Sequence, residues 1–387
     1  MKIIKLPFMA KKPILACGAD MKGAFAIAKG KEAFLFDAFG DLGDPDNLAK
    51  YEKSVREQIK KLGIKPAVIA CDLHPEYFSS KFAESFQFGC SRAHLSVPYN
   101  CQLYRVQHHE AHVAAGIVDN NIKGSVIGVA FDGTGYGSDG NIWGGEFFIG
   151  NPDKFIRVAH LEYIPMPGGE CAIKEPWRMA LSYLYHACED KKITSRLVQN
   201  YISSESEKHN FGLARRIKIL LDQKLNSPLT SSAGRLFDAA GSLILAKGRV
   251  SREAELPIEL ERSISGKECG SYKFKFQTGR EGLIIDTTGI IKGIIKDLAG
   301  KTRKPEISRK FHNAIADIVA ETVLRLSKKF GIKKTVLSGG VFQNRYLTAK
   351  AVRLLTAKGI KVYTHSNIAA NDSGIPLGQI AIASMRG

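Results

Sequence analysis

The chain has 387 residues, of which 44% are hydrophobic and 24% are charged. These proportions exclude a largely disordered or fibrous chain, and at roughly 100 to 200 residues per domain the length predicts two lobes. The 56 Lys and Arg against 38 Asp and Glu leave a net charge of +18, which favours an anionic partner: a nucleotide, a nucleic acid or an acidic protein.

Seven cysteines are scattered along the chain without a C-x-x-C pair, so neither structural zinc nor a disulfide framework is supported. Lys11 and Lys12 interrupt the apolar N-terminal stretch before it reaches signal length, and no run of about 18 apolar residues occurs. We therefore expect a cytoplasmic protein without a membrane partner.

The first predicted elements are strands joined by glycine turns. Residues 14–36 alternate apolar stretches with two such turns, the first holding Asp20 and Lys22, and so predict three strands. Residues 47–64 have the apolar spacing of an amphipathic helix, and a buried strand follows at 66–74.

A second strand, glycine turn and strand occupy residues 126–149, with Asp132 after the first strand. Two such hairpins predict two similar lobes, each pointing a carboxylate toward a shared cleft. We place the lobes at 13–125 and 126–387, the second with an inserted helical region at about 150–300.

The last third alternates helix and strand most clearly. Residues 311–331 predict an amphipathic helix that ends at Gly331, followed by strand, helix and strand. Gly339 and Gly340 fall at the carboxyl end of a strand, where α/β sheets collect ligands.

The sharpest motif is VQHHEAHVAAGIVDN, which places His108 and His112 four residues apart on one face of a predicted helix. So spaced, the two imidazoles either hold one metal ion or are structural histidines. The zincin motif would need histidine at Val113, so the spacing excludes that protease class. His109 points elsewhere and is interpreted as supporting or structural.

Three turns add candidates, each with a plainer alternative. Asp132 and its glycines either bind phosphate or metal, or only turn a hairpin. Gly340 and Asn344 either hold a phosphate or nucleoside at a helix start, or form a simple strand-to-helix turn. Asp372, in ANDSGIPLGQ, is on its own most simply a helix N-cap.

Taken together, His108, His112, Asp132 and Asp372 form a two-nitrogen, two-oxygen ligand set that suits zinc or ferrous iron. The residues that we predict to bind phosphate or nucleotide are Lys22, Gly133, Gly135, Gly339, Gly340 and Asn344.

Several motifs in order resemble the transferase domain of the HypF carbamoyltransferases, from about Ile14 to Ala383 and including DLHPEY at 72–77. These motifs are VQHHEAH, FDGTGYGSDGNIWGGE, PGGECAIKEPWRMAL, TSSAGRLFDA, LSGGVFQNRYL and ANDSGIPLGQ. The enzymes that make threonylcarbamoyladenosine in tRNA are more distant relatives with the same fold.

The resemblance implies an actin-like (ASKHA) α/β fold, with a nucleotide between two lobes and a metal at the four ligand positions named above. It also implies that carbamoyl-adenylate, derived from ATP, is the donor and that the C-terminal cysteine of HypE is the acceptor, in nickel-iron hydrogenase maturation. The attacking sulfur then belongs to the partner, so no catalytic nucleophile is assigned in this chain.

Two features depart from the family's pattern. The acylphosphatase-like, C-x-x-C and adenylate-forming domains of full-length HypF are not among these residues, so we expect a separate protein to supply carbamoyl-adenylate, or the chain to be a fragment. Glu253-Ala254-Glu255-Leu256-Pro257 replaces an EGQAA-like segment. A tRNA-modifying transferase, which the charge would suit, and a non-catalytic nucleotide-binding scaffold are the alternatives.

Overall fold

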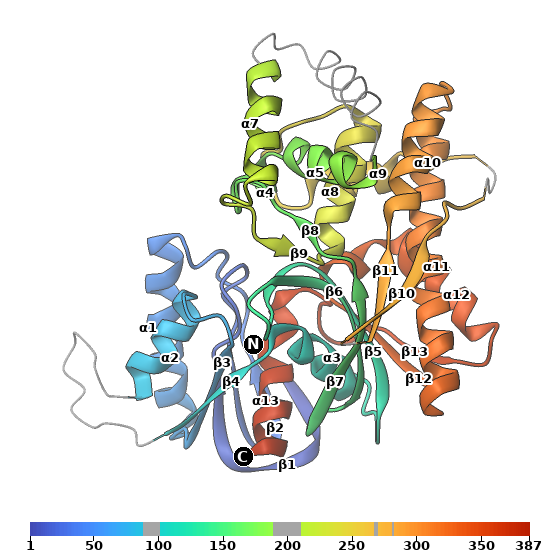
Figure 1. The fold of residues 1–387 in the computed structure, drawn as a ribbon. Helices are drawn as coiled ribbons and strands as arrows, with labels where there is room; N and C mark the ends of the chain where they lie inside the picture. The colour runs from blue at the N-terminus through green and yellow to red at the C-terminus, as the bar shows by residue number, and fades with distance from the viewer. Residues whose placement is uncertain (88–100, 189–209, 267–269, 281) are drawn as a thin grey trace.

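The computed structural model describes residues 1–87, 101–188, 210–266, 270–280 and 282–387, and it contains two sheets with helices packed around them (Figure 1). Cys90 and Cys269 lie outside the described residues. Within the described ranges, no helix combines the length and apolarity needed to cross a bilayer.

The N-terminal sheet has four strands in the order β2-β1-β3-β4. Its strands are β1 (Lys2–Ala16), β2 (Ala26–Leu35), β3 (Val68–Asp72) and β4 (Gln102–Val106). β1 runs antiparallel to β2 and parallel to β3, which is parallel to β4. The helices α1 (Pro45–Leu62) and α2 (Phe78–Gln87) lie together beside this sheet, and α1 confirms the predicted amphipathic helix by burying Tyr51, Val55 and Ile59 (Figure 1).

The prediction of three strands in residues 14–36 was wrong. β1 already begins at Lys2, and β2 continues through the glycine that we read as a second turn. Gly30 has a φ of 62°, and the register shifts on either side of its pairing with Ala10. A left-handed glycine within a strand makes a bulge, which bends the ladder without reversing the chain.

The second sheet has nine strands, with the main order β10-β11-β7-β6-β5-β12-β13. These strands are β5 (Val126–Tyr136), β6 (Ile142–Asn151), β7 (Lys154–Leu161), β10 (Lys275–Gly279), β11 (Gly282–Asp286), β12 (Lys334–Ser338) and β13 (Lys361–Tyr363). The short β8 (Ile164–Pro165) and β9 (Leu229–Thr230) pair off this path. The hairpin predicted at 126–149 is thus β5 and β6, paired antiparallel.

Helices fill the inserted region and cover the second sheet. They are α4 (Cys171–Lys174), α5 (Trp177–Ala187), α7 (Asn210–Asp222), α8 (Ala233–Leu245), α9 (Glu255–Arg262), α10 (Thr288–Ala299), α11 (Lys304–Phe330) and α12 (Arg345–Thr356). α11 ends before Gly331 as predicted, but it begins at Lys304, because Pro305 in its first turn is compatible with a helix start.

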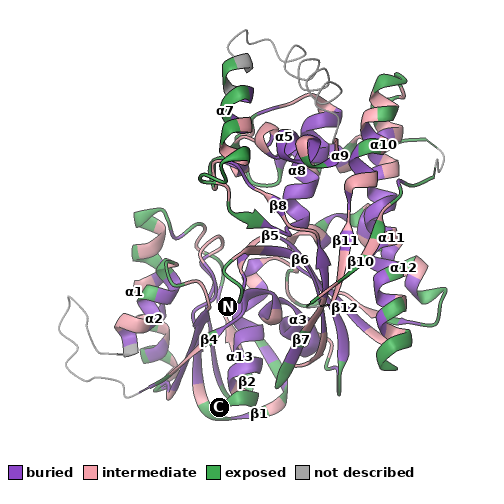
Figure 2. Cartoon of the chain, viewed as in Figure 1, coloured by how far each residue is buried: buried purple, intermediate pink, exposed green. Residues whose placement is uncertain are grey.

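Two further helices lie where the sheets meet. α3 (His108–Asp119) and α13 (Ile375–Arg386) pack against each other; α13 also contacts β1, and α3 contacts β5 and β12. α3 is buried along nearly its whole length (Figure 2). Side chains presented at the start of α3 therefore face both halves of the molecule.

Candidate functional site

The two histidines are positioned by the end of a parallel strand pair. β4 ends at Val106, and the Gln107 side chain caps α3 by accepting hydrogen bonds from the backbone N–H groups of His109 and Glu110. His108 is thus the first helical residue, and His112 follows one turn later with its ring centroid 5.0 Å away. The predicted helix and its shared face are present.

The two aspartates reach the histidines from distant parts of the chain. Asp132 lies in the buried strand β5, and its Oδ1 accepts a hydrogen bond of 2.9 Å from the Gly340 backbone N–H. Asp372 opens the short 3-10 helix η2 (Asp372–Gly374). The cap of that turn is Asn371, which accepts from the Ser373 N–H, so the simpler interpretation of Asp372 as an N-cap was wrong.

The four side chains converge on one point. His108 Nε2 lies 3.3 Å from Asp132 Oδ2 and 3.6 Å from Asp372 Oδ1, and the corresponding distances from His112 Nε2 are 3.3 and 3.4 Å. All four residues are buried, and one ligand atom from each lies within 4.8 Å of the others. Ligand atoms about 2.1 Å from a shared tetrahedral ion are about 3.4 Å apart, so the donor set fits such an ion in chemistry and spacing.

The electrostatics of the cluster are those of buried opposite charges. Burial alone would lower the pKa of His108 and His112, but the surrounding carboxylates outweigh it and raise both. Burial alone would raise the pKa of Asp132 and Asp372, yet the two imidazoles lower both. The two imidazoles and the two carboxylates thus favour each other's charged forms.

His109 does not join this cluster. Its ring packs against Trp143, with the centroids 6.2 Å apart, and burial followed by the positive field of His108 lowers its pKa well below the usual range. Gly135 packs against the same rings, because a Cβ there would lie 2.5 Å from His109 Cε1 and 2.9 Å from His108 Cδ2. Gly135, predicted as a phosphate-binding residue, thus packs against two histidine rings and is not in the lining of the cavity described below.

One residue that contacts the cluster, Asp72, was not predicted from the sequence. Asp72, the last residue of β3 and fully buried, places Oδ2 2.7 Å from His108 Nδ1. The sequence held a signal for it, because a carboxylate that ends a buried strand lies at the same sheet edge as the residues after the neighbouring parallel strand.

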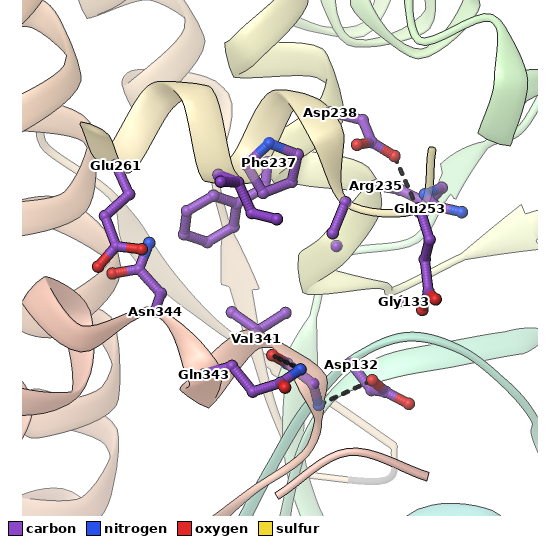
Figure 3. A pocket seen from close by; sticks show the side chains of 15 residues that line it. Asp132, Gly133, Arg235, Phe237, Asp238, Glu253, Glu261, Val341, Gln343 and Asn344 are labelled. Atoms are coloured by element: carbon purple, nitrogen blue, oxygen red, sulfur yellow. Dashed lines mark hydrogen bonds and ion pairs between the residues drawn. The ribbon is translucent and has the colours of Figure 1, made fainter. Parts of the chain in front are cut away.

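A cavity of about 300 Å³ lies beside the cluster and is lined at one end by Asp132 and Gly133 (Figure 3). α8 contributes Phe237 and the ion pair of Arg235 with Asp238, at 2.8 Å. The remaining lining comes mainly from α9 and the loop before it, and from residues 340–344. Its size and mixed apolar and polar lining suit a small organic ligand.

The other predicted nucleotide-binding residues fall into two groups. Gly340 and Asn344 line the cavity, as does Gly133. Gly339 and Lys22 are not in its lining: a Cβ on Gly339 would meet the Phe131 carbonyl oxygen at 2.2 Å, and Lys22 forms a 2.5 Å ion pair with Glu253. Glu253 itself lines the cavity, so Lys22 reaches its rim from the N-terminal half.

Fold, cavity and ligand cluster together define an α/β protein with a cavity for a small organic ligand next to a candidate metal centre. Family models described as "HypF Kae1-like domain" and "Carbamoyltransferase, Kae1-like Domain, second subdomain" match residues 9–119 and 128–379. The chain belongs to the HypF carbamoyltransferase family. Its α/β, actin-like fold class and its assignment as a carbamoyltransferase are thereby confirmed.

Individual relatives agree with this assignment. The carbamoyltransferase HypF homolog of Cupriavidus necator is 33% identical, over 96% of this chain and 91% of that protein. The carbamoyltransferase HypF of Synechocystis sp. is 32% identical, over 97% of this chain and 48% of that protein. A crystal structure of full-length HypF in a phosphate- and nucleotide-bound form is 34% identical, with a TM-score of 0.88 over 99% of this chain and 47% of that one.

The chain is also similar, over a shorter stretch, to the tRNA-modifying enzymes that we expected to be its more distant relatives. A tRNA N6-adenosine threonylcarbamoyltransferase of Persephonella marina is 31% identical over 126 residues, which is 33% of this chain. The chain itself spans nearly the whole of the Cupriavidus relative but about half of the Synechocystis protein and of the crystallised HypF.

Proposed function

We propose that the chain transfers a carbamoyl group from carbamoyl-adenylate to the C-terminal cysteine of a HypE-like partner protein in hydrogenase maturation. The observation that carries this proposal is the position of Asp132, which both belongs to the four-residue ligand cluster and lines the adjoining cavity. A metal ion and the phosphate end of a nucleotide would meet at this residue.

The cluster supplies the metal site of the proposal. His108, His112, Asp132 and Asp372 would hold zinc or ferrous iron, both of which accept mixed nitrogen and oxygen ligands. When bound, such an ion supplies Lewis-acid stabilisation of negative charge on a phosphoryl or carbonyl oxygen.

The cavity supplies the nucleotide site. Phe237 and Val341 offer apolar surface for a nucleobase, while the buried guanidinium of Arg235 places positive charge in the cavity lining, near Gly133 (Figure 3). The crystallised full-length HypF is itself a phosphate- and nucleotide-bound form, which supports this assignment. The nucleotide would lie with its phosphate toward Asp132 and its base toward α8 and α9.

The transfer step needs no nucleophile from this chain. The partner's cysteine thiolate attacks the carbamoyl carbon, and a carbon–sulfur bond forms as the bond from that carbon to the phosphate oxygen breaks. AMP would leave with the negative charge, and the guanidinium of Arg235, which is paired with Asp238 in the cavity lining, would contribute to stabilising it. Carbamoyl-adenylate would be supplied by a separate protein or, if the chain is a fragment, by the rest of a longer protein.

The direct test supplies carbamoyl-adenylate and a peptide with the HypE C-terminal sequence, and follows peptide mass. We expect the purified chain to carbamoylate the peptide, and His108→Ala or His112→Ala to lose bound metal and at least about 100-fold in rate together. Metal content by elemental mass spectrometry is the second readout. Full transfer by a metal-free His108→Ala protein would refute the metal role.

The net charge of +18 and the partial similarity to tRNA threonylcarbamoyltransferases favour a second candidate, transfer of a threonylcarbamoyl group to tRNA. That function requires tRNA binding that weakens steeply with salt. Tight tRNA binding at 50 mM salt without peptide carbamoylation would replace the first proposal by the second; nucleotide binding without either transfer would indicate a scaffold.

A further inference from the structure

We propose that Asp72 is a positioning residue for the metal site and acts through His108, an inference that rests on the metal-dependent function proposed above. It lies outside the four-residue ligand cluster and contacts the side of the His108 ring opposite to that cluster.

The sheet register puts Asp72 beside His108. β3 and β4 are parallel, with Asp72 paired to Val106, so both strands end at the same edge. His108 follows two residues after Val106, at the first position of α3. The Asp72 side chain is fully buried, and its Oδ2 lies 2.7 Å from His108 Nδ1.

Contacts other than the one with His108 hold Asp72 in place. Its other oxygen, Oδ1, accepts a 2.9 Å hydrogen bond from the His74 backbone N–H, and the Asp72 carbonyl oxygen accepts from the Ser80 hydroxyl at 3.2 Å. Backbone and side chain are therefore both fixed. An oxygen acceptor at a fixed place selects the ring orientation and the tautomer of the imidazole it contacts.

The contact with Asp72 determines which ring nitrogen of His108 can bind a metal ion. A carboxylate acceptor at Nδ1 requires that nitrogen to carry the proton, so in the neutral ring Nε2 carries the lone pair. Nε2 is the atom that faces Asp132 Oδ2 at 3.3 Å and Asp372 Oδ1 at 3.6 Å. The carboxylate also makes the imidazole a stronger electron donor to a metal ion.

A second aspartate with a buried side chain, Asp119 in the same helix as His108, provides a matched control. Asp119 ends α3, its side chain is fully buried, and it lies 3.7 Å from His365 Nδ1. Its oxygens accept from the Ser366 and Asn367 backbone N–H groups, and His365 Nε2 lies 2.8 Å from the Ser338 hydroxyl. This Asp–His pair fastens a loop and does not belong to the ligand cluster.

The test compares Asp72→Asn with Asp119→Asn by calorimetric titration with Zn²⁺ and by the visible absorption spectrum of the Co²⁺-loaded protein. If the amide oxygen keeps the His74 bond, the amide N–H₂ faces Nδ1 and forces the ring proton onto Nε2, the ligand atom. We expect Asp72→Asn to bind Zn²⁺ about 10- to 100-fold more weakly with an altered Co²⁺ spectrum, and Asp119→Asn to bind as the wild type does.

The outcomes separate this inference from the function on which it rests. Wild-type Zn²⁺ affinity in Asp72→Asn, with affinity lost in His108→Ala, would overturn the role of Asp72 alone. Equal affinity in the wild type and His108→Ala would overturn the metal site itself. If Asp72→Asn does not fold, nitrogen-15 NMR of the zinc-loaded wild type decides: we expect a slowly exchanging proton on His108 Nδ1, and zinc on Nδ1 would refute the proposal.

Discussion

Two hairpins of similar local sequence place an aspartate beside glycines, and the structure uses the two carboxylates differently. Asp20, between β1 and β2, accepts hydrogen bonds from the backbone N–H groups of Phe78 and Ser79 at 2.7 and 2.9 Å, at the start of α2. Asp132, in β5, points one oxygen at Gly340 N and the other at two histidines.

The difference shows that the neighbouring element decides what such a carboxylate does. A helix begins against the first hairpin, so Asp20 satisfies its unpaired N–H groups. A helix whose first turns carry two imidazoles lies against the second hairpin, and these lower the pKa of Asp132 against the effect of burial. For Asp20, burial dominates over its backbone hydrogen bonds and raises the pKa.

We expect the largest effect from replacing the carboxylate of Asp132, in the second hairpin. Asp132→Asn can still accept the Gly340 hydrogen bond through its amide oxygen, but it removes one negative oxygen from the ligand set. We expect bound metal to be lost, with transfer reduced by at least about 100-fold, in a protein that remains folded. Elemental analysis, the peptide transfer assay and circular dichroism measure the three quantities.

Asp20→Asn is the matched control because it makes the same change in the other hairpin. It should retain metal and transfer at wild-type levels. If Asp20→Asn also released the metal, both hairpins would serve the same site and the distinction drawn between them would be wrong.

Adding a methyl group at Gly135 of the second hairpin should have an intermediate effect on stability and on Zn²⁺ binding. Gly135→Ala puts a Cβ within 2.5 to 2.9 Å of the His109 and His108 rings, so it should destabilise the fold by about 1 to 3 kcal/mol and weaken Zn²⁺ binding by shifting His108. Urea unfolding and Zn²⁺ titration test both effects.

Gly30→Ala in the first hairpin is its counterpart. The new Cβ would meet nothing within 4 Å, so only the left-handed φ of 62° disfavours it, by about 1 kcal/mol. Zn²⁺ affinity should not change. An unchanged affinity in Gly135→Ala as well would show that the contact with His108 does not position the ligand.

We expect the smallest effect from removing the Asp20 side chain that caps the start of α2. Asp20→Ala leaves the Phe78 and Ser79 N–H groups without their acceptor and should lower the free energy of unfolding by about 1 kcal/mol, the usual contribution of a helix cap. Urea unfolding measures it, and metal content should stay constant. A loss well above this size would mean that Asp20 holds more than the start of α2.

Much of the fold follows from local pattern, because helix and strand periods are written into neighbouring residues. The amphipathic helix at 47–64 and the strand, helix and strand after Gly331 were confirmed for that reason. The bulge at Gly30 was read as a turn, since a left-handed glycine serves both purposes and only the partner strand distinguishes them.

The candidate site was predictable where its parts are adjacent in the chain. The spacing of His108 and His112 places them together within one helix. The approach of Asp372 depends on packing between segments hundreds of residues apart; its residue type made it a candidate ligand, and the family resemblance strengthened its grouping with the histidines. Asp72 was overlooked because its position at the end of a predicted buried strand indicates a place near the histidines only once the pairing of β3 with β4 is known.

The shared position of Asp132 has a thermodynamic consequence. One of its oxygens faces the imidazoles, and the residue also lines the cavity. If the protein binds an ion at the cluster and a nucleotide in the cavity, each ligand alters the electrostatic field and the geometry of the other's site. The affinities for the two ligands are then linked. By reciprocity, whatever factor the ion contributes to nucleotide affinity, the nucleotide contributes to ion affinity. In the reaction proposed above, release of AMP after each turnover would then change how tightly the ion is retained.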